Sequence, residues 1–194
     1  TIIGSYGTGK SSFLLALEKD LQSKGSYSLL NPHTLSSKAK FDVLKIVGDY
    51  QDLVSLMRDK LSVDGTADNV LERLREIYNQ AKKQGKFLVI FIDEFGKVLE
   101  HAAKNNPEQE LYFMQKLAEF VNVSTRQILL VTTLHQNFSA YARKLSALQK
   151  EEWTKVKGRF KELVFIEPVE QLLYLASTQL NAKNEVGVNA ESME

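Results

Sequence analysis

One short segment near the amino terminus constrains this chain more than any other. Residues 4–11 read Gly-Ser-Tyr-Gly-Thr-Gly-Lys-Ser and fit G-x-x-x-x-G-K-[ST], the phosphate-binding loop or Walker A motif. The glycines let the backbone curl so that successive N–H groups face an anion. Lys10 supplies a flexible positive charge for the β- and γ-phosphates, and the Ser11 hydroxyl can ligate Mg²⁺. The segment therefore predicts a site for a nucleoside triphosphate.

The residues on either side of this loop agree with that interpretation. The segment Thr1-Ile2-Ile3 is typical of the end of a strand, and apolar residues recur with helical spacing after the loop. A helix from Lys10 to about Lys24 would direct its positive amino-terminal end at the phosphates. We expect nucleotide contacts from Gly4, Ser5, Tyr6, Gly7, Thr8, Gly9, Lys10, Ser11 and Ser12.

A second feature completes the predicted site. Residues 87–92 form a continuous apolar run, as in a strand buried on both faces of a parallel sheet, and Asp93-Glu94 follow directly. This is the Walker B pattern, in which Asp93 and Ser11 hold Mg²⁺ and Glu94 polarises the attacking water. Carboxylates at the end of a buried strand need a cation or polar partners. Because the sequence shows no site for another phosphate acceptor, the pair favours hydrolysis over a small-molecule kinase.

Composition narrows the class of protein. The chain has 194 residues, of which 43% are hydrophobic and 25% charged, enough for a single core. A net charge of +1 gives no global field for nucleic acid or membrane, and the absence of cysteine excludes disulfides and thiol chemistry. No apolar run reaches membrane-spanning length and no signal peptide is visible, so we expect a cytoplasmic domain. Since Thr1 already lies within a strand, we expect a segment of a longer protein.

Predicted strands and helices alternate along the chain, which indicates a three-layer α/β fold. We expect a P-loop NTPase fold, a mostly parallel sheet with helices on both faces, over residues 1–180, and a polar tail or linker over 181–194. Further strands are predicted at 27–30, 41–47, 128–131 and 163–166, with a transition to helix as the alternative at 41–47. Further helices are predicted at 53–61, 70–81, about 108–121 and 145–156, and after Pro168, with loops at 31–40 and 101–107.

This order of elements and motifs resembles the nucleotide-binding core of the AAA+ ATPases, a group within the ASCE division of P-loop proteins. The resemblance implies ATP and Mg²⁺ as ligands and a polar residue, called sensor 1, near the end of the strand after Walker B. Thr133 and His135 are both candidates for that residue, and spacing alone does not choose between them. His135 would depart from the usual Asn or Thr. Its alternative role is that of a surface histidine in a turn.

The resemblance also implies an arginine finger shortly before the last strand of the core. Arg159, within Lys-Gly-Arg-Phe at 157–160, occupies that position and would stabilise charge on the γ-phosphate of a neighbouring subunit. The alternative is a solvated arginine on a basic turn. After Leu180 the sequence has only a polar tail, so the helical lid typical of the family is either missing or lies outside this segment. No aromatic pair typical of the pore loop of unfoldases occurs between the two Walker motifs. Initiator-like, loader-like and STAND-like signalling ATPases remain.

One stretch carries local charge that the nucleotide site does not explain. Residues 143–161 contain seven basic side chains against two glutamates, Glu151 and Glu152. This stretch is either a solvated helix face, a contact for DNA or RNA phosphates, or a contact for an acidic face of a neighbouring subunit. The sequence thus predicts a Mg²⁺-dependent ATPase that couples nucleotide to conformational change or assembly. The alternative function is a nucleotide-gated switch or scaffold with little turnover.

Overall fold

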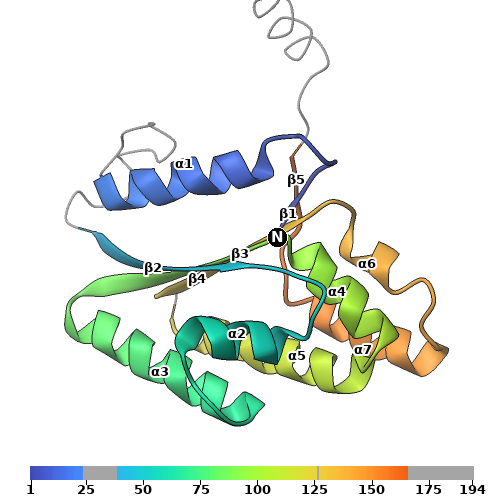
Figure 1. The fold of residues 1–194 in the computed structure, drawn as a ribbon. Coiled ribbons are helices and arrows are strands. Elements are labelled where there is room, and N and C mark those ends of the chain that lie inside the picture. Colours follow the sequence, from blue (N-terminus) through green and yellow to red (C-terminus); the bar gives the residue numbers. More distant parts are fainter. Residues whose placement is uncertain (24–38, 126, 166–194) are drawn as a thin grey trace, which may run out of the picture. The chain divides into compact units, whose positions relative to one another are not determined.

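A computed structural model describes residues 1–23, 39–125 and 127–165 of the chain (Figure 1). Within residues 1–164, five strands form one sheet in the order β2-β3-β4-β1-β5, and all of their pairings are parallel. The strands are β1 (Ile2–Ile3), β2 (Lys40–Val47), β3 (Lys86–Asp93), β4 (Ile128–Leu134) and β5 (Leu163–Val164). The helices are α1 (Lys10–Ser23), α2 (Leu53–Leu61), α3 (Ala67–Lys83), α4 (Phe95–Lys104), α5 (Pro107–Val123), α6 (Phe138–Tyr141) and α7 (Ala147–Lys157).

The sheet lies between two layers of helices, as the sequence predicts. Of the described helices, α1 covers one face of the sheet, and α2, α3 and α5 cover the other (Figure 1). A parallel sheet requires a crossover between neighbouring strands, and helices supply most of these crossovers. The three-layer α/β P-loop fold is therefore confirmed.

Strand β3 forms the centre of the core because it is apolar on both faces. Its residues from Leu88 to Ile92 are at most 1% exposed. Leu88, Ile90 and Ile92 alternate along the strand and join one buried cluster with side chains from α2, α3, α4 and α5. Burying both faces fixes β3 between β2 and β4, and this placement holds the acidic pair at its carboxyl end.

Local signals explain where several helices begin. Asp52 caps α2 by accepting a hydrogen bond of 2.7 Å from the Ser55 N–H. Ser146 and Gln149 form a reciprocal capping box at the start of α7. Pro107 opens α5, a position where its missing N–H costs nothing. These boundaries agree with the predicted helices to within a few residues.

Helix α4 corrects the sequence-based prediction of a loop at 101–107. Residues 101–104 form the last turn of α4, and Val98, Leu99 and Ala102 are fully buried on one of its faces. This spacing is typical of an amphipathic helix, but Gly96 in the first turn and the lack of a capping side chain hide the start of the helix. The short helix α6 was also not predicted.

The structure also tests the strands predicted at 41–47 and 163–166. Residues 40–47 form a complete strand, β2, without a transition to helix. Strand β5 ends at Val164, earlier than predicted. The predicted strand at 27–30, the helix after Pro168 and the tail at 181–194 lie outside the described residues, as does most of the loop at 31–40. In the described part of the chain, none of the helices combines the length and apolar character that crossing a membrane requires.

Candidate nucleotide site

The phosphate-binding loop connects β1 to α1 at the carboxyl end of the sheet. The Gly4 N–H donates to the Leu134 carbonyl at 3.0 Å, which extends the pairing of β1 with β4 into the loop. Gly7 and Gly9 have φ angles of +79° and +82°, in the left-handed region that side chains strain. An added Cβ would meet no atom within 4 Å at either position. The two glycines are therefore needed for backbone conformation rather than for space.

Lys10 folds over this loop from the first turn of α1. Its Nζ donates to the carbonyl oxygens of Gly4 at 2.8 Å and of Ser5 at 2.7 Å. The Thr8 hydroxyl also donates to the Ser5 carbonyl, at 2.9 Å. The ammonium group is thus held at the mouth of the loop, while Ser11 stays exposed at the helix start. A positive charge, a helix amino terminus and a free hydroxyl suit a Mg²⁺-bound phosphate.

The acidic pair lies at the end of β3. In the sheet, β4 lies between β3 and β1, the strand that leads into the phosphate loop. The Thr133 hydroxyl donates to Asp93 Oδ1 at 2.6 Å and accepts from the Glu94 N–H at 2.9 Å. The Glu94 N–H also donates to Asp93 Oδ1 at 3.0 Å. Thr133 is 1% exposed, whereas Asp93 and Glu94 are only partly buried, so the network lies between the core and the surface of the sheet edge. Because two donors hold one oxygen of Asp93, its second oxygen remains available to a metal ion.

Glu94 has an unusual backbone conformation. Its φ and ψ angles are 55° and 30°, a left-handed conformation that costs a residue with a side chain of the order of 1 kcal/mol. The residue joins β3 directly to α4, and its carboxylate lies 3.7 Å from the Lys97 ammonium. Such strain concentrates at functional sites, where surrounding structure holds it. The tight junction brings the Glu94 N–H onto Asp93 Oδ1 and leaves the Glu94 carboxylate near Lys97.

Both candidates for the sensor residue lie beside the predicted site, in different ways. Thr133 binds the acidic pair, whereas His135 lies just past the end of β4 and stacks on Tyr6 of the phosphate loop, with ring centroids 4.6 Å apart. Sequence reasoning did not find Glu100 or Tyr141, which flank the His135 ring. Their link to His135 depends on how α4 and α6 pack beside the end of β4, which local sequence spacing does not specify.

The predicted arginine finger follows α7. Arg159 forms an ion pair of 3.1 Å with Glu119 of α5 in the same chain, and its side chain is 33% exposed. The next residue, Phe160, packs against Phe138 at 5.7 Å and Phe95 at 6.2 Å between ring centroids. This packing fixes the turn that carries Arg159. The structure of one chain does not bring Arg159 into contact with the described residues of the phosphate loop, so its role in a neighbouring subunit stays a prediction.

The basic stretch at 143–161 is partly neutralised within the chain. Lys155 pairs with Glu152 at 2.6 Å, and Lys157 with Glu162 at 3.8 Å. For Arg143 and Lys150, the described residues offer no ion-pair partner, and both line a hollow between α6 and α7. The charge available to a partner is therefore smaller than the sequence count suggests.

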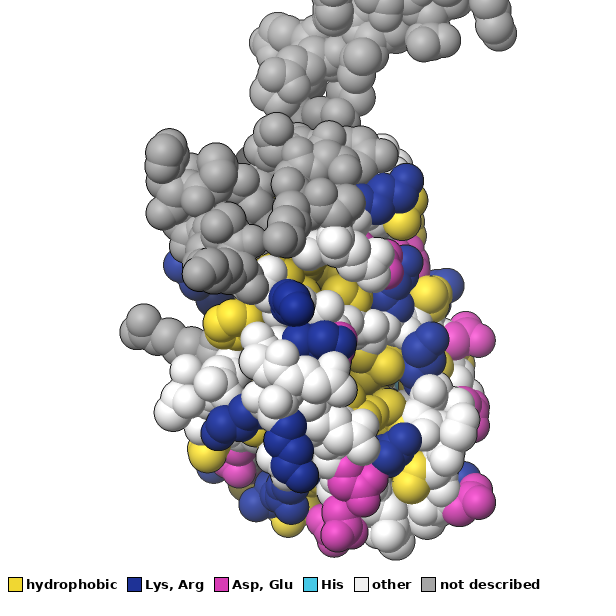
Figure 2. All heavy atoms as spheres, turned by 90° about the vertical axis from the view of Figure 1, so that its left-hand side faces the viewer, with side chains coloured by type: hydrophobic (Ala, Val, Ile, Leu, Met, Phe, Trp, Pro, Cys, Tyr) yellow, Lys and Arg dark blue, Asp and Glu magenta, His cyan; other side chains and the backbone are white. Residues whose placement is uncertain are grey.

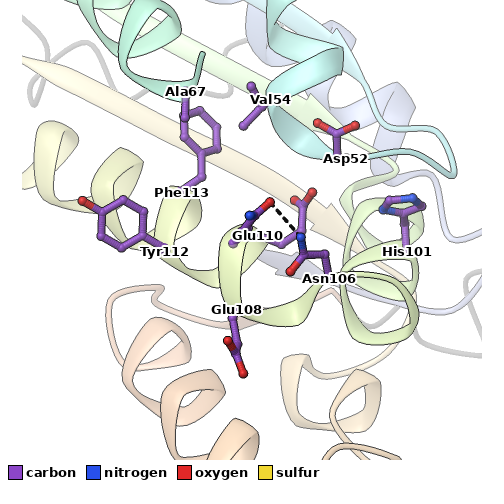
Figure 3. Close-up of a pocket in the computed structure, with 10 residues that line it drawn as sticks. Asp52, Val54, Ala67, His101, Asn106, Glu108, Glu110, Tyr112 and Phe113 are labelled. Atoms are coloured by element: carbon purple, nitrogen blue, oxygen red, sulfur yellow. Dashed lines mark hydrogen bonds between the residues drawn. The ribbon is translucent and has the colours of Figure 1, made fainter.

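Two further hollows have linings without residues of the phosphate loop. One, of about 620 Å³, lies where α2 and α5 begin and α4 ends, and contains Asp52, His101 and the buried Glu110 (Figure 3). The other, of about 440 Å³, is apolar and lies at the amino ends of β2, β3 and β4, with Phe87 and Leu129 in its lining. Figure 2 views the molecule from this end of the sheet and shows hydrophobic side chains among lysines and arginines. Neither hollow contains a residue predicted to bind nucleotide.

The arrangement defines the class of protein. A glycine-rich loop between strand and helix, with an acidic pair at the carboxyl end of the strand two places away in the sheet, is the architecture of P-loop NTPases. Residues 1–156 match the ATPase family associated with various cellular activities (AAA), and the chain belongs to this family. No curated protein sequence matches the chain.

Solved structures show where the fold recurs. The chain is similar to the ORC2 protein of Aeropyrum pernix, solved as ADPNP–ADP complexes, with a TM-score of 0.54 and 14% identity over 84% of this chain and 41% of that one. Cdc6p of Pyrobaculum aerophilum aligns with a TM-score of 0.44 and 16% identity, over 84% of this chain and 38% of that one. The chain spans less than half the length of either protein. At these identities the likeness to ORC2 shows the fold alone.

Proposed function

We propose that this domain binds Mg²⁺·ATP and hydrolyses it. The observation that carries the proposal is the Thr133 network, which holds Asp93 and Glu94 beside the end of β4, next to the strand that leads into the phosphate loop. The acidic pair, Thr133 and the phosphate cradle thus belong to three neighbouring strands, β3, β4 and β1. Such an arrangement suits phosphoryl transfer to water, in which catalysis is mostly positioning and charge stabilisation.

Each part of the site has a role in this proposal. The N–H groups of residues 4–12 and the Lys10 ammonium bind the phosphates. The Ser11 hydroxyl and the Asp93 carboxylate are hard oxygen ligands of the kind that Mg²⁺ prefers, so the donor set fits this ion. Glu94 orients the attacking water, and Thr133 or His135 serves as the sensor of the γ-phosphate. Bound Mg²⁺ would offset the charge of the phosphates.

Adenine is the base that we propose. The chain belongs to an ATPase family, and the Asn-Lys-x-Asp sequence that reads guanine does not occur in it.

We place the domain in the cytoplasm. Disulfides are rare in cytosolic proteins, and this chain has no cysteine to form one. Turnover would drive a conformational change or the assembly of a larger complex, with subunits meeting at the Arg159 face. The exposed basic residues between 143 and 161 suit nucleic-acid phosphates as an additional ligand.

The competing function is a nucleotide-gated switch with little turnover. The strained backbone at Glu94 favours hydrolysis, because a switch that only binds nucleotide does not require a carboxylate fixed beside Asp93. Steady-state ATP turnover by the complete protein, with and without DNA, separates the two functions. Tight binding without turnover under both conditions would establish the switch.

Lys10→Ala tests the phosphate loop itself. Removing the ammonium deletes charge-assisted contacts with the phosphates but no buried packing, so we expect Mg²⁺·ATP affinity to fall by roughly a hundredfold or more with the fold retained. Lys83→Ala, on an exposed position of α3, is the matched control and should bind as the wild type does. Equal affinities of all three proteins in calorimetry would refute the proposed site.

A further inference from the structure

The phosphate loop carries an aromatic side chain that the proposed chemistry does not use. Tyr6 is 69% exposed, yet its ring lies flat against the imidazole of His135, with centroids 4.6 Å apart and planes 21° from parallel. An exposed ring on a glycine-rich loop has many rotamers available. Stacking restricts them and connects the middle of the loop to the residue that follows β4.

His135 is held in turn by two other elements. Its Nε2 lies 3.4 Å from the carboxylate of Glu100 on α4, and its Nδ1 lies 3.3 Å from the hydroxyl of Tyr141 on α6. The Tyr141 ring also meets the imidazole edge-on, at 5.5 Å between centroids. Burial, and then the charge of Glu100, raise the pKa of Tyr141, so its hydroxyl stays protonated. The Tyr141 hydroxyl also lies 3.5 Å from Nε2, so it faces the imidazole edge that carries both nitrogens.

Gly96 of α4 makes room for this group of side chains. A Cβ at that position would collide with the Tyr141 hydroxyl and come within 3.0 Å of the His135 ring atoms Cε1 and Nδ1. Glycine in a helix costs up to about 1 kcal/mol relative to alanine. Alanine at position 96 cannot fit without moving Tyr141 or His135. Glycine therefore allows the two rings to pack here, although it makes the first turn of α4 less stable.

We propose that His135 is a positioning residue that orders the phosphate loop by stacking on Tyr6, and that it thereby connects the loop to α4, the helix that follows Asp93 and Glu94. The proposal deepens the proposed function, on which it rests. A loop already ordered before nucleotide arrives loses less conformational freedom on binding. Loss of the stacking should therefore weaken nucleotide binding while the chemical step changes less.

This role differs from direct contact of His135 with the γ-phosphate. A direct contact needs a polar group, so His135→Asn would preserve it and His135→Phe would remove it. Stacking needs a ring, so His135→Phe would preserve most of it and His135→Asn would remove it. The two variants give opposite orders of activity for the two roles. Tyr6→Ala adds a variant at an exposed position, where the folded core is not at risk.

The first measurement uses nucleotide. For Tyr6→Ala and His135→Asn we expect the Kd for Mg²⁺·ADPNP and the KM for Mg²⁺·ATP to rise roughly three- to tenfold, with a smaller change in kcat. The double variant Tyr6→Ala/His135→Asn should be no worse than either single one, because both remove the same contact. His135→Phe should restore most of the affinity. Additive losses, or a fall in kcat for His135→Phe with His135→Asn near the wild type, would overturn the positioning role.

The second measurement needs no nucleotide. Amide hydrogen exchange of the peptide that spans residues 4–9 should quicken in His135→Asn and Tyr6→Ala and stay slower in His135→Phe. Exchange that is equal in all variants overturns the proposal even if ATP binds. A loop ordered by His135 in a protein that binds no ATP would instead refute the proposed function and leave the positioning role standing.

Discussion

The Thr133 hydroxyl donates a hydrogen bond of 2.6 Å to Asp93 Oδ1, from the middle strand of the three that carry the candidate site. Thr133 also accepts from the Glu94 N–H, so one buried hydroxyl binds the Asp93 carboxylate and the backbone of Glu94. Removing it would leave the Asp93 carboxylate and the Glu94 N–H with one hydrogen bond fewer each, in a partly buried region.

Thr133→Val should therefore lower both stability and turnover. Valine keeps the shape and the strand preference of threonine, so we expect a loss of about 1–3 kcal/mol in the free energy of unfolding and at least a roughly tenfold fall in kcat. Thr133→Ser keeps the hydroxyl and should lose much less. The control is Thr132→Val, whose hydroxyl bonds Thr1 at 2.8 Å instead of the acidic pair. Equal kcat for both valine variants would make Thr133 a structural residue only.

The acidic pair should separate into two functions. Glu94→Gln keeps the shape and loses the charge, so it should bind Mg²⁺·ATP but turn it over at least roughly a hundredfold more slowly. Asp93→Asn should instead weaken the dependence of binding on Mg²⁺, because it removes a metal ligand. Calorimetry with and without Mg²⁺, together with phosphate release, measures both effects. Asp59→Asn, on an exposed position of α2, is the control, and wild-type turnover in Glu94→Gln would assign the chemistry elsewhere.

Arg159 should act between subunits. We expect Arg159→Ala to bind ATP nearly normally and to hydrolyse it at least roughly tenfold more slowly, because charge on the γ-phosphate loses its partner. Mixing Arg159→Ala with Lys10→Ala should restore part of the activity, since Lys10→Ala subunits still donate Arg159 to intact sites. The assay requires the complete protein at several concentrations.

Two controls distinguish the finger from the ion pair that Arg159 makes with Glu119. Glu119→Gln removes that pair but leaves the arginine, so its turnover should stay well above that of Arg159→Ala. Arg143→Ala removes a positive charge from the same basic stretch and should have little effect. Specific activity that stays constant on dilution, no recovery on mixing, and equal defects in Glu119→Gln and Arg159→Ala would together reduce Arg159 to a surface residue.

Glu110 should make stability depend on pH. Its side chain is 5% exposed in the hollow shared with Asp52 and His101, and burial raises its pKa from 4.5 to about 7 against the opposing effect of the Leu53 N–H bond. The folded state therefore holds this proton more tightly than the unfolded chain does. The resulting stabilisation is complete below the ordinary pKa of 4.5 and is lost as the pH rises through about 7.

The comparison with Glu110→Gln isolates this effect. Relative to that variant, the wild type should lose up to about 3 kcal/mol of unfolding free energy between about pH 4.5 and pH 8, measured by urea denaturation. Glu108→Gln, on an exposed position of the same helix, should show no such trend. A constant difference between wild type and Glu110→Gln across this range would mean that Glu110 is ionised in the folded state.

Much of the site was readable from the sequence because its parts are contiguous. Eight residues in a row specify the phosphate loop, since the left-handed backbone at Gly7 and Gly9 demands glycine whatever lies nearby. A strand buried on both faces appears as an unbroken apolar run, so β3 and its acidic end were predicted correctly. The alternation of strands and helices then leaves few topologies for a parallel sheet.

Tertiary structure decided the rest, because these features depend on residues far apart in the chain. The bond from Thr133 to Asp93 exists only because β4 lies beside β3, and the stacking of His135 on Tyr6 only because β1 lies beside β4. By helix propensity alone Gly96 is unfavourable, and the reason for a glycine at this position is the Tyr141 hydroxyl that a Cβ would meet. Sequence spacing specifies backbone conformation and periodic burial, whereas side-chain partners across a sheet are fixed by strand order, which is a property of the assembled core.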